Sequence, residues 1–480
     1  MWDTDNMFLN GPFAPWREEG EAFDLEIEGE LPRELNGVLY RTGSNQHYRP
    51  PNPDRYHWFE GTGMIHAVFI RDGRATYRNR YVRTDALKLE MQEGGPVLGG
   101  MMTGGDLAGL PEGAPLFRDP ANTHVTLFND RLLVFSADLP HELRPDTLET
   151  VGRYDFHGAL TSPGPGPLGL TPHFRIDPGN GDLLFFVSMG NDMTWYRADR
   201  SGKLCDVHHF DMGVPSWIHD YVVTPDYAIF LIYPMFFRIE NAVTGLPPLI
   251  WDTDTLETCR FAVLNRHTGA VQWIDTPDAF APTHFFNAYQ DGSKVIVDGE
   301  RVPTMGTLLQ DIESSVSAKE DMKAGTVWRW ELDLERGVVG GGAVTDVGSG
   351  FPRINDQLAG LRHNFGYFAS NRGLNEWITD GVAKVDFTSG NTEVQSLDGA
   401  VTSPNEPVFV PREGATAEDD GWVLTIWWDP ATDRSEVIVQ DAQDFTAAPV
   451  ARIKLNHRVP LGFHGSWSSA AELDAALRRD

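Results

Sequence analysis

The fold of this chain is decided by stretches such as HAVFIRDGRATYRNRYV, residues 66–82. Branched and aromatic residues lie on both sides of Asp72-Gly73, and this dipeptide is typical of the tight turn that joins two antiparallel strands. The same arrangement of two β-like runs around a short polar turn recurs along the chain. It is found in residues 123–137, 173–189, 221–233, 259–276, 285–299 and 383–397.

The hairpins recur at roughly even spacing over 480 residues, without a linker-like break. A chain of hairpins too long for one sandwich favours an all-β propeller, and we expect one domain over residues 1–480. Two β-sandwich or barrel domains are the alternative. Helical periodicity is confined to residues 85–110, 305–323 and 468–478.

Composition and charge exclude several classes of partner. Hydrophobic residues make up 41% of the chain, and the net charge is −30, so nucleic acid and anionic membranes are poor partners. The two cysteines, Cys205 and Cys259, form no CxxC pair, which fits a reducing cytoplasm and argues against thiolate metal ligands. We expect no signal peptide, because the first residues lack a basic region followed by a long apolar run. We expect no membrane span, because no stretch of 18 apolar residues occurs.

Four histidines share one context: His173, His219, His284 and His464 each lie at the start or end of a β-like run, beside an aromatic residue or a proline. Their separations of 46, 65 and 180 residues are too wide for a local zinc motif, but a propeller axis brings such residues together. Imidazole suits zinc, copper, iron and nickel. The spacing therefore predicts an axial metal site and leaves iron and zinc both open.

The chain resembles the carotenoid cleavage oxygenase family, which includes apocarotenoid oxygenases and lignostilbene dioxygenases. The resemblance runs nearly end to end and rests on eight stretches that occur in the family's order. Any one of them is a weak signal, whereas the ordered set is specific. They are LPRELNGVLYRTGSN (31–45), FEGTGMIHAVF (59–69), ANTHV (121–125), HFRIDPGNGDLLFF (173–186), WIHDYVVT (217–224), HFFNAYQDG (284–292), EPVFVPR (406–412) and FHGSW (463–467).

The resemblance implies a seven-bladed propeller, with a few helices and loops capping one face over the active site. It implies Fe(II) held on the axis by His173, His219, His284 and His464. It also implies an oxygenase that splits a C=C bond with O2 and yields two carbonyl products. Thr123 matches a family threonine whose methyl group faces the open iron position.

Behind the ligands the chain departs from the family, which usually sets three glutamates there to orient the imidazole rings. Glu406 matches one of them. Ser136 stands where the first glutamate aligns, although Asp138 is close enough for the alignment to slip, and Gly350 stands at the second position. We therefore expect one ligand ring to find a backbone carbonyl, water or Ser136 as its partner.

The substrate region departs as well. Lignostilbene enzymes share a Lys–Tyr pair that grips a phenol, whereas here Phe135 occupies the lysine position and the tyrosine region offers Met101 and Met102. Apolar side chains favour an apolar alkene such as an apocarotenoid, with a stilbene or phenylpropenoid as the alternative. The candidates for lining the substrate tunnel are Phe59, Met101, Phe135, Trp217 and Phe285.

Other functions remain possible on the same propeller. A Ca²⁺-dependent hydrolase would need converging oxygen ligands, an inactive relative would only bind its ligand, and some family members isomerise polyenes. The chain lacks GxSxG, HExxH and P-loop motifs. We expect O2 and a hydrophobic alkene as partners, transient membrane contact through residues 231–240 or 85–110, and no obligate protein partner.

Overall fold

The stretch 66–82 forms the predicted hairpin. Strand β4 (Gly63–Arg71) pairs with β5 (Arg74–Tyr81), and Arg71 lies opposite Arg74. Asp72 and Gly73 both have positive φ, 52° and 74°, and this two-residue turn has a twist that matches the twist of the strands. The computed structural model describes residues 2–100, 110–111, 114–115, 118–161, 168–244, 246, 248–305, 325–371, 378–397 and 402–479.

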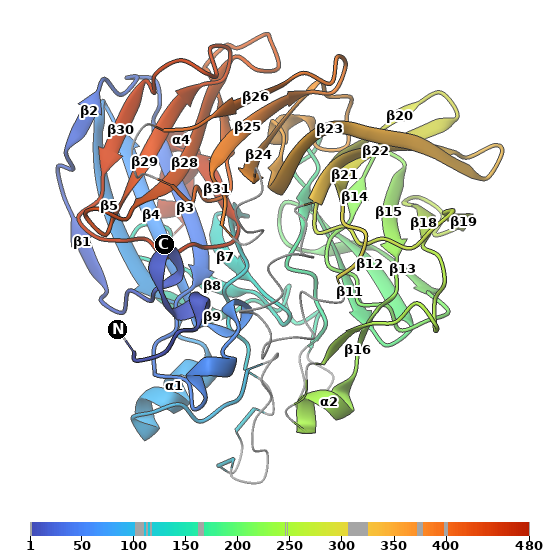
Figure 1. The fold of residues 1–480 in the computed structure, drawn as a ribbon, viewed down its shortest axis with the longest axis horizontal. Coiled ribbons are helices and arrows are strands. Elements are labelled where there is room, and N and C mark those ends of the chain that lie inside the picture. Colours follow the sequence, from blue (N-terminus) through green and yellow to red (C-terminus); the bar gives the residue numbers. More distant parts are fainter. Residues whose placement is uncertain are drawn as a thin grey trace.

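The described residues form a seven-bladed β-propeller, as predicted (Figure 1). In Figure 1 the red strands near the C-terminus lie beside the blue strands near the N-terminus. The first three blades, in sheet order, are β1 (Gly20–Ala22), β5, β4, β3 (Gly37–Ser44) and β31 (Gly465–Ser469); β6 (His124–Phe128), β7 (Arg131–Phe135), β8 (His141–Leu143) and β9 (Thr150–Arg153); and β10 (Arg175–Ile176), β11 (Leu183–Met189), β12 (Asp192–Ala198) and β13 (Leu204–Asp211).

The fifth and sixth blades are continuous, because both use the long strand β23 (Val338–Arg353). This strand pairs with β22 (Gly325–Asp333) of the fifth blade on one side and with β24 (Phe365–Asn371) of the sixth on the other. The fourth blade is β14 (Val222–Val223), β15 (Tyr227–Ile232), β18 (Arg260–Asn265) and β19 (Val271–Asp275), with β16 (Met235–Phe237) and β17 (Leu249–Trp251) as a separate pair. The fifth and sixth comprise β20 (Phe285–Asp291), β21 (Lys294–Arg301), β22 (Gly325–Asp333), β23, β24 (Phe365–Asn371), β25 (Gly381–Asp386) and β26 (Thr392–Gln395).

The two ends of the chain close the ring. Strand β2 (Ile27–Gly29), near the N-terminus, joins the seventh blade, where Ile27 lies opposite Ile453. Strand β31, near the C-terminus, joins the first blade, where Leu39 lies opposite Trp467. Closure by exchange of strands leaves no open seam between the first and last blades. The seventh blade is β2 (Ile27–Gly29), β30 (Ala451–Lys454), β29 (Arg434–Asp441), β28 (Gly421–Asp429) and β27 (Val408–Pro411).

The hydrophobic core is a ring of clusters between successive blades. Alternate residues of each strand face one neighbouring blade, so β-branched and aromatic side chains of two sheets pack together. Leu133 and Phe185 join the second and third blades, for example, and Val68 and Val437 join the first and seventh. This packing fixes the blades around the axis and thereby the loops that meet there.

Helices are few, as expected. Helix α1 (Asp85–Glu93) covers the start of the predicted segment 85–110, and α4 (Ala470–Leu477) matches 468–478. Helix α2 (Ile239–Thr244) was not predicted, and most of 305–323 lies outside the described residues. In the described part of the chain, the helices are too short and too polar to cross a membrane. The 3₁₀ turns are Met7–Leu9, Gly11–Phe13, Pro53–Arg55, Trp58–Glu60 and Asp356–Leu358.

The expectation of one domain over residues 1–480 stays a prediction. The alternative of two sandwich or barrel domains is wrong, because the sheets follow one another as blades of one ring that its first and last strands close.

Candidate metal centre

The four predicted ligands all stand directly before an edge strand of a blade. His173 lies two residues before β10, His219 three before β14, and His284 and His464 immediately precede β20 and β31. The edge strands of different blades contact one another, as β14 does with β20 and β27 does with β31. The four histidines therefore enter the axis from four blades, which is why residues so far apart in sequence can meet.

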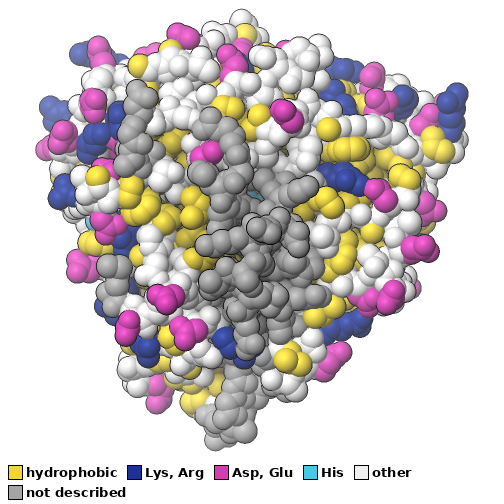
Figure 2. All heavy atoms as spheres, viewed as in Figure 1, with side chains coloured by type: hydrophobic (Ala, Val, Ile, Leu, Met, Phe, Trp, Pro, Cys, Tyr) yellow, Lys and Arg dark blue, Asp and Glu magenta, His cyan; other side chains and the backbone are white. Residues whose placement is uncertain are grey.

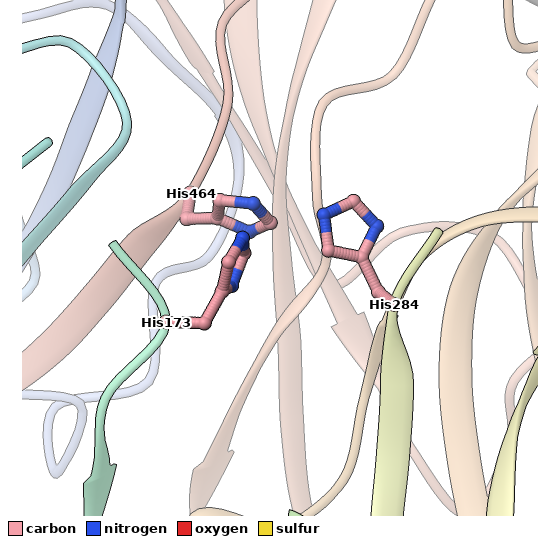
Figure 3. A group of neighbouring side chains, drawn as sticks. All are labelled: His173, His284 and His464. Carbon is pink, nitrogen blue, oxygen red and sulfur yellow. The ribbon is translucent and has the colours of Figure 1, made fainter. Parts of the chain in front are cut away.

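Figure 3 shows the imidazole rings of His173, His284 and His464 pointing toward one another. The Nε2 atom of His219 lies 3.0 Å from Nε2 of His173 and 3.3 Å from Nε2 of His284. One ring nitrogen each of His173, His284 and His464 lies within 4.8 Å of the others. Adjacent nitrogens bound to one metal at about 2.1 Å stand about 3 Å apart, so the cluster fits a metal ion bound by imidazoles.

Burial keeps the rings of His173, His219 and His464 neutral. It lowers the pKa of His173 and His219 well below the usual value, and the neighbouring histidines lower both further. Burial also lowers the pKa of His464 to about 4, although Glu406 opposes the shift. A histidine binds a metal only through a deprotonated nitrogen, so these three histidines are in their ligating form at neutral pH.

Glu406 orients the His464 ring. Its Oε1 atom lies 2.7 Å from Nδ1 of His464, so Nδ1 carries the proton and Nε2 keeps a free lone pair for the cluster. Burial opposes the charge of this carboxylate, but Arg353, His464 and Arg41 together hold its pKa well below the usual range. The backbone N–H of Gly465 donates to Oε2 at 2.8 Å. Glu406 is therefore a fixed, charged anchor.

Residues 13–469 match the family model described as RPE65, retinal pigment epithelial membrane protein. The chain belongs to this carotenoid cleavage oxygenase family. It is 30% identical to the apocarotenoid-15,15′-oxygenase of a Synechocystis strain, over 94% of both chains. It is 28% identical to the isoeugenol monooxygenase of Pseudomonas nitroreducens, over 96% of this chain and 97% of that one.

A solved structure of the family shares the whole architecture. The crystal structure of Pseudomonas brassicacearum lignostilbene dioxygenase superimposes with a TM-score of 0.88 at 27% identity, covering 97% of this chain and 99% of that one. The predictions of the family and of the seven-bladed propeller are confirmed.

A carboxylate that was not predicted lies behind His284. Oε2 of Glu300 lies 3.5 Å from Nδ1 of His284. That Gly350 stands at the position of the family's second glutamate stays a prediction. Glu300 is fully buried and comes from β21, the strand paired with the one that His284 precedes. Sequence reasoning missed it; the signal was an acidic residue at the end of the apolar run KVIVDGE, residues 294–300.

The carboxylate of Asp220 lies behind His173. Its Oδ1 lies 4.0 Å from His173 Nδ1, and the same atom accepts a hydrogen bond of 2.8 Å from Arg175. Ser136 is buried, and its predicted place behind the ligands stays a prediction. The Asp138 carboxylate accepts hydrogen bonds from Arg153 at 3.0 Å and from the backbone N–H of Leu168 at 3.3 Å.

Thr123 is joined to the cluster through its backbone. Its carbonyl accepts the backbone N–H of His464 at 3.0 Å, and its hydroxyl donates to Asn122 at 3.1 Å. Its predicted role at the open metal position is untested. The next residue, His124, is a further imidazole beside the cluster and is buried, with its centroid 5.1 Å from the ring of His464 and stacked on Phe174 at 4.4 Å. His124 was not predicted.

The predicted tunnel residues lie in different surroundings. Trp217 stacks on His219 with 5.1 Å between ring centroids, and Phe59 lies 5.8 Å from Phe463. Phe285 is buried against the core of the fourth and fifth blades, and Phe135 is wholly buried between the second and third. Met101 lies outside the described residues. Their contact with substrate stays a prediction.

Phe351 is a further ring at the centre that was not predicted. Its centroid lies 5.5 Å from His464 and 5.8 Å from His284. Its φ of +56° is unusual for a residue with a bulky side chain, and such strain is held by the surrounding structure. Phe351 thus places an apolar wall beside two of the four histidines.

Proposed function

We propose that this protein is a non-haem Fe(II) dioxygenase that cleaves a C=C bond of an apolar alkene with O2. One alkene and one O2 give two carbonyl products, so the atoms balance without a further reductant. The observation that carries the proposal is the convergence of His173, His219, His284 and His464 with no carboxylate in the cluster itself, among the residues that the structure describes. Four imidazoles suit iron and leave coordination positions open, as oxygen chemistry requires.

The residues of the chain supply positioning and exclusion of water. Iron, when bound, supplies the reduction of O2. His464 is held in one tautomer by Glu406, and the rings of Trp217 and Phe351 stand beside the histidines, where they keep the surroundings apolar. An apolar, water-poor cavity strengthens electrostatic interactions and suppresses side reactions. We assign the open position to Thr123 and the tunnel to Phe59, Met101, Phe135, Trp217 and Phe285.

The proposed substrate class is an apocarotenoid or related terpenoid alkene. Phe135 at the position of the family's lysine supports this choice, because a benzyl group cannot accept a phenol proton or stabilise a phenolate. A stilbene or phenylpropenoid is the second candidate, favoured by the likeness to the lignostilbene dioxygenase and isoeugenol monooxygenase. Aldehyde analysis on both substrate classes separates them.

We also propose a cytoplasmic location, without nucleic-acid partners, and transient contact with a membrane that stores the apolar substrate. Cys205 and Cys259 are both free thiols, which fits a reducing compartment. In Figure 2 hydrophobic side chains gather nearer the middle of the face shown, while charged ones crowd its rim. Met91 on α1 and Leu246 just after α2 are exposed apolar residues. A lipid-vesicle flotation assay tests this contact.

The activity is tested by product analysis under ¹⁸O2. Cleavage to two carbonyls that carry label supports the oxygenase. An isomerised alkene without label supports an isomerase, and tight binding without turnover supports a binding protein; either result overturns the proposal. Calcium instead of iron in the purified protein points to a hydrolase.

A further inference from the structure

Glu300 lies across the β20–β21 hairpin from His284. Its backbone N–H donates to the carbonyl of His284 at 2.9 Å, and its Oε2 faces His284 Nδ1 at 3.5 Å. Two hydroxyl groups fix the carboxylate: that of Thr283 donates to Oε2, and that of Ser349 donates to Oε1 at 2.8 Å. The Thr283 hydroxyl therefore fixes one oxygen of the Glu300 carboxylate and the Ser349 hydroxyl on β23 fixes the other. The oxygen held by Thr283 also faces the His284 ring.

A β-bulge creates this pairing. Counting outward from the turn at Asp291 and Lys294, regular pairing would set Arg301 opposite His284. The register shifts between Phe285 and Asn287, so that Phe285 pairs with Gly299 and His284 faces Glu300. Bulges often re-aim a side chain next to a functional site, and this bulge aims a carboxylate at a ligand ring.

The charges at the centre are balanced except at Glu300. Glu406 has two arginine partners, Arg41 at 3.2 Å and Arg353 at 2.9 Å, and Asp220 has Arg175 at 2.8 Å. Glu300 is wholly buried, yet among the described residues its one ion-pair partner is His284. Burying a carboxylate is costly unless a counter-charge is near. A dication in the histidine cluster would supply that counter-charge.

Gly350 leaves room for this substitution. A Cβ atom built at Gly350 would meet only the carbonyl oxygen of Ala369, at 3.9 Å, so nothing from that position fills the space. The preceding residue, Ser349, instead turns its hydroxyl to Glu300. Strand β23, on which the family's glutamate was expected at Gly350, therefore supplies the Ser349 hydroxyl that holds the Glu300 carboxylate of β21.

We propose that Glu300 is a positioning residue of the metal centre, replacing the carboxylate missing at Gly350. It orients the His284 ring through Nδ1 and balances part of the positive charge of the metal. The inference rests on the proposed iron centre. It concerns metal binding and the ring geometry, so its test does not depend on turnover.

The test compares Co²⁺ affinity of the metal-free full chain, wild type against Glu300→Gln, by chelator competition. Partners behind a metal-bound histidine typically contribute about 10- to 100-fold to metal affinity, and we expect a loss in this range. Thermal unfolding of the metal-free proteins is measured in parallel. Because Glu300 has no arginine or lysine partner among the described residues, we expect Glu300→Gln not to lower the unfolding temperature.

The control is Glu436→Gln, a buried glutamate in the seventh blade that pairs with Arg452 and Lys454. It should lose thermal stability and keep Co²⁺ affinity. Equal Co²⁺ affinity of wild type and Glu300→Gln overturns the inference. A wild type that binds no Co²⁺ overturns the metal centre itself, which is a different failure.

Ser349→Ala gives a second, milder variant, which decides the matter if Glu300→Gln does not fold. It leaves the carboxylate in place and removes one donor that orients it. A several-fold loss of Co²⁺ affinity supports the inference, and an unchanged affinity contradicts it.

Discussion

His464 Nδ1 and Glu406 Oε1 lie 2.7 Å apart, and Glu406 is in turn held by Arg41 and Arg353. The predicted metal ligand His464 is thus attached to a charged network that spans the first, sixth and seventh blades. Glu406→Gln removes the negative charge from between two buried arginines. We expect a loss of about 3–5 kcal/mol in the free energy of unfolding, since breaking one partner of a buried network strands the others. Urea unfolding of the metal-free protein measures it.

Comparison of Glu406→Gln with Glu300→Gln separates the effect on stability from the effect on metal binding. Glu300→Gln should lower Co²⁺ affinity and leave the free energy of unfolding unchanged, whereas Glu406→Gln should lower both. If Glu406→Gln unfolds at the wild-type urea concentration, the network does not stabilise the fold as described.

The pKa of His464, about 4 in the folded protein and about 6.5 in the unfolded chain, makes stability depend on pH. Between these values the unfolded chain binds a proton that the folded one does not, so stability falls as the pH falls. At pH 5, about 1.5 pH units below the unfolded pKa, His464 alone accounts for a loss of about 2 kcal/mol relative to pH 7.

Urea unfolding at pH 7 and pH 5 checks this linkage, with metal-free wild type compared with His464→Asn. The wild type should lose about 2 kcal/mol more than the variant between the two pH values. Equal losses would show that His464 is not held neutral by burial.

The Asp72-Gly73 turn requires positive φ at both residues. Gly73→Ala puts a Cβ atom on a backbone with φ of +74°, and we expect it to cost about 1 kcal/mol of unfolding free energy. Gly20→Ala is the matched control, because a Cβ atom placed on Gly20 meets nothing within 4 Å and the φ of Gly20 is not positive. Similar effects of both changes on urea unfolding would contradict this view of the turn.

Substitutions of Trp217 and Phe135 show whether these two predicted tunnel residues contribute to substrate turnover, to stability of the core, or to both. Trp217 is half-buried and stacks on His219, so Trp217→Ala should lower kcat/KM for an apolar alkene by about tenfold with iron content unchanged. Phe135 has no exposed surface, so Phe135→Ala should cost about 3–5 kcal/mol of stability. Because we also assign Phe135 to the tunnel, we expect Phe135→Ala to lower kcat/KM as well. Urea unfolding and kinetics on both variants test this, and an unchanged kcat/KM for either variant would contradict its place in the tunnel.

The fold was largely predictable because each hairpin can be recognised from a short local stretch of sequence. Turn dipeptides such as Asp72-Gly73 fix register, and regular spacing of the hairpins indicates blades. The sharing of β23 (Val338–Arg353) by two blades could not be predicted, since it depends on which neighbours each half of one long strand meets. Helix α2 (Ile239–Thr244) is too short to show helical periodicity.

At the site, the convergence of the four histidines could be predicted because each lies at the start or end of a recognisable β-like run. Glu300 could not, because its place opposite His284 depends on the bulge in β20, which moves the pairing by one residue. His124 and Phe351 reach the centre through strand register and a positive φ that the sequence does not reveal. Local sequence patterns therefore predict the four histidines, whereas the residues that surround them depend on strand register in the folded protein.

The most direct test of the central claim is the iron content of anaerobically purified protein, with EPR after addition of nitric oxide, beside His464→Ala. A four-histidine iron centre should give about one iron per chain and a high-spin Fe–NO signal that is lost in the variant. Zinc, calcium or no metal in the wild type, or an unchanged signal in the variant, would contradict a four-histidine iron centre.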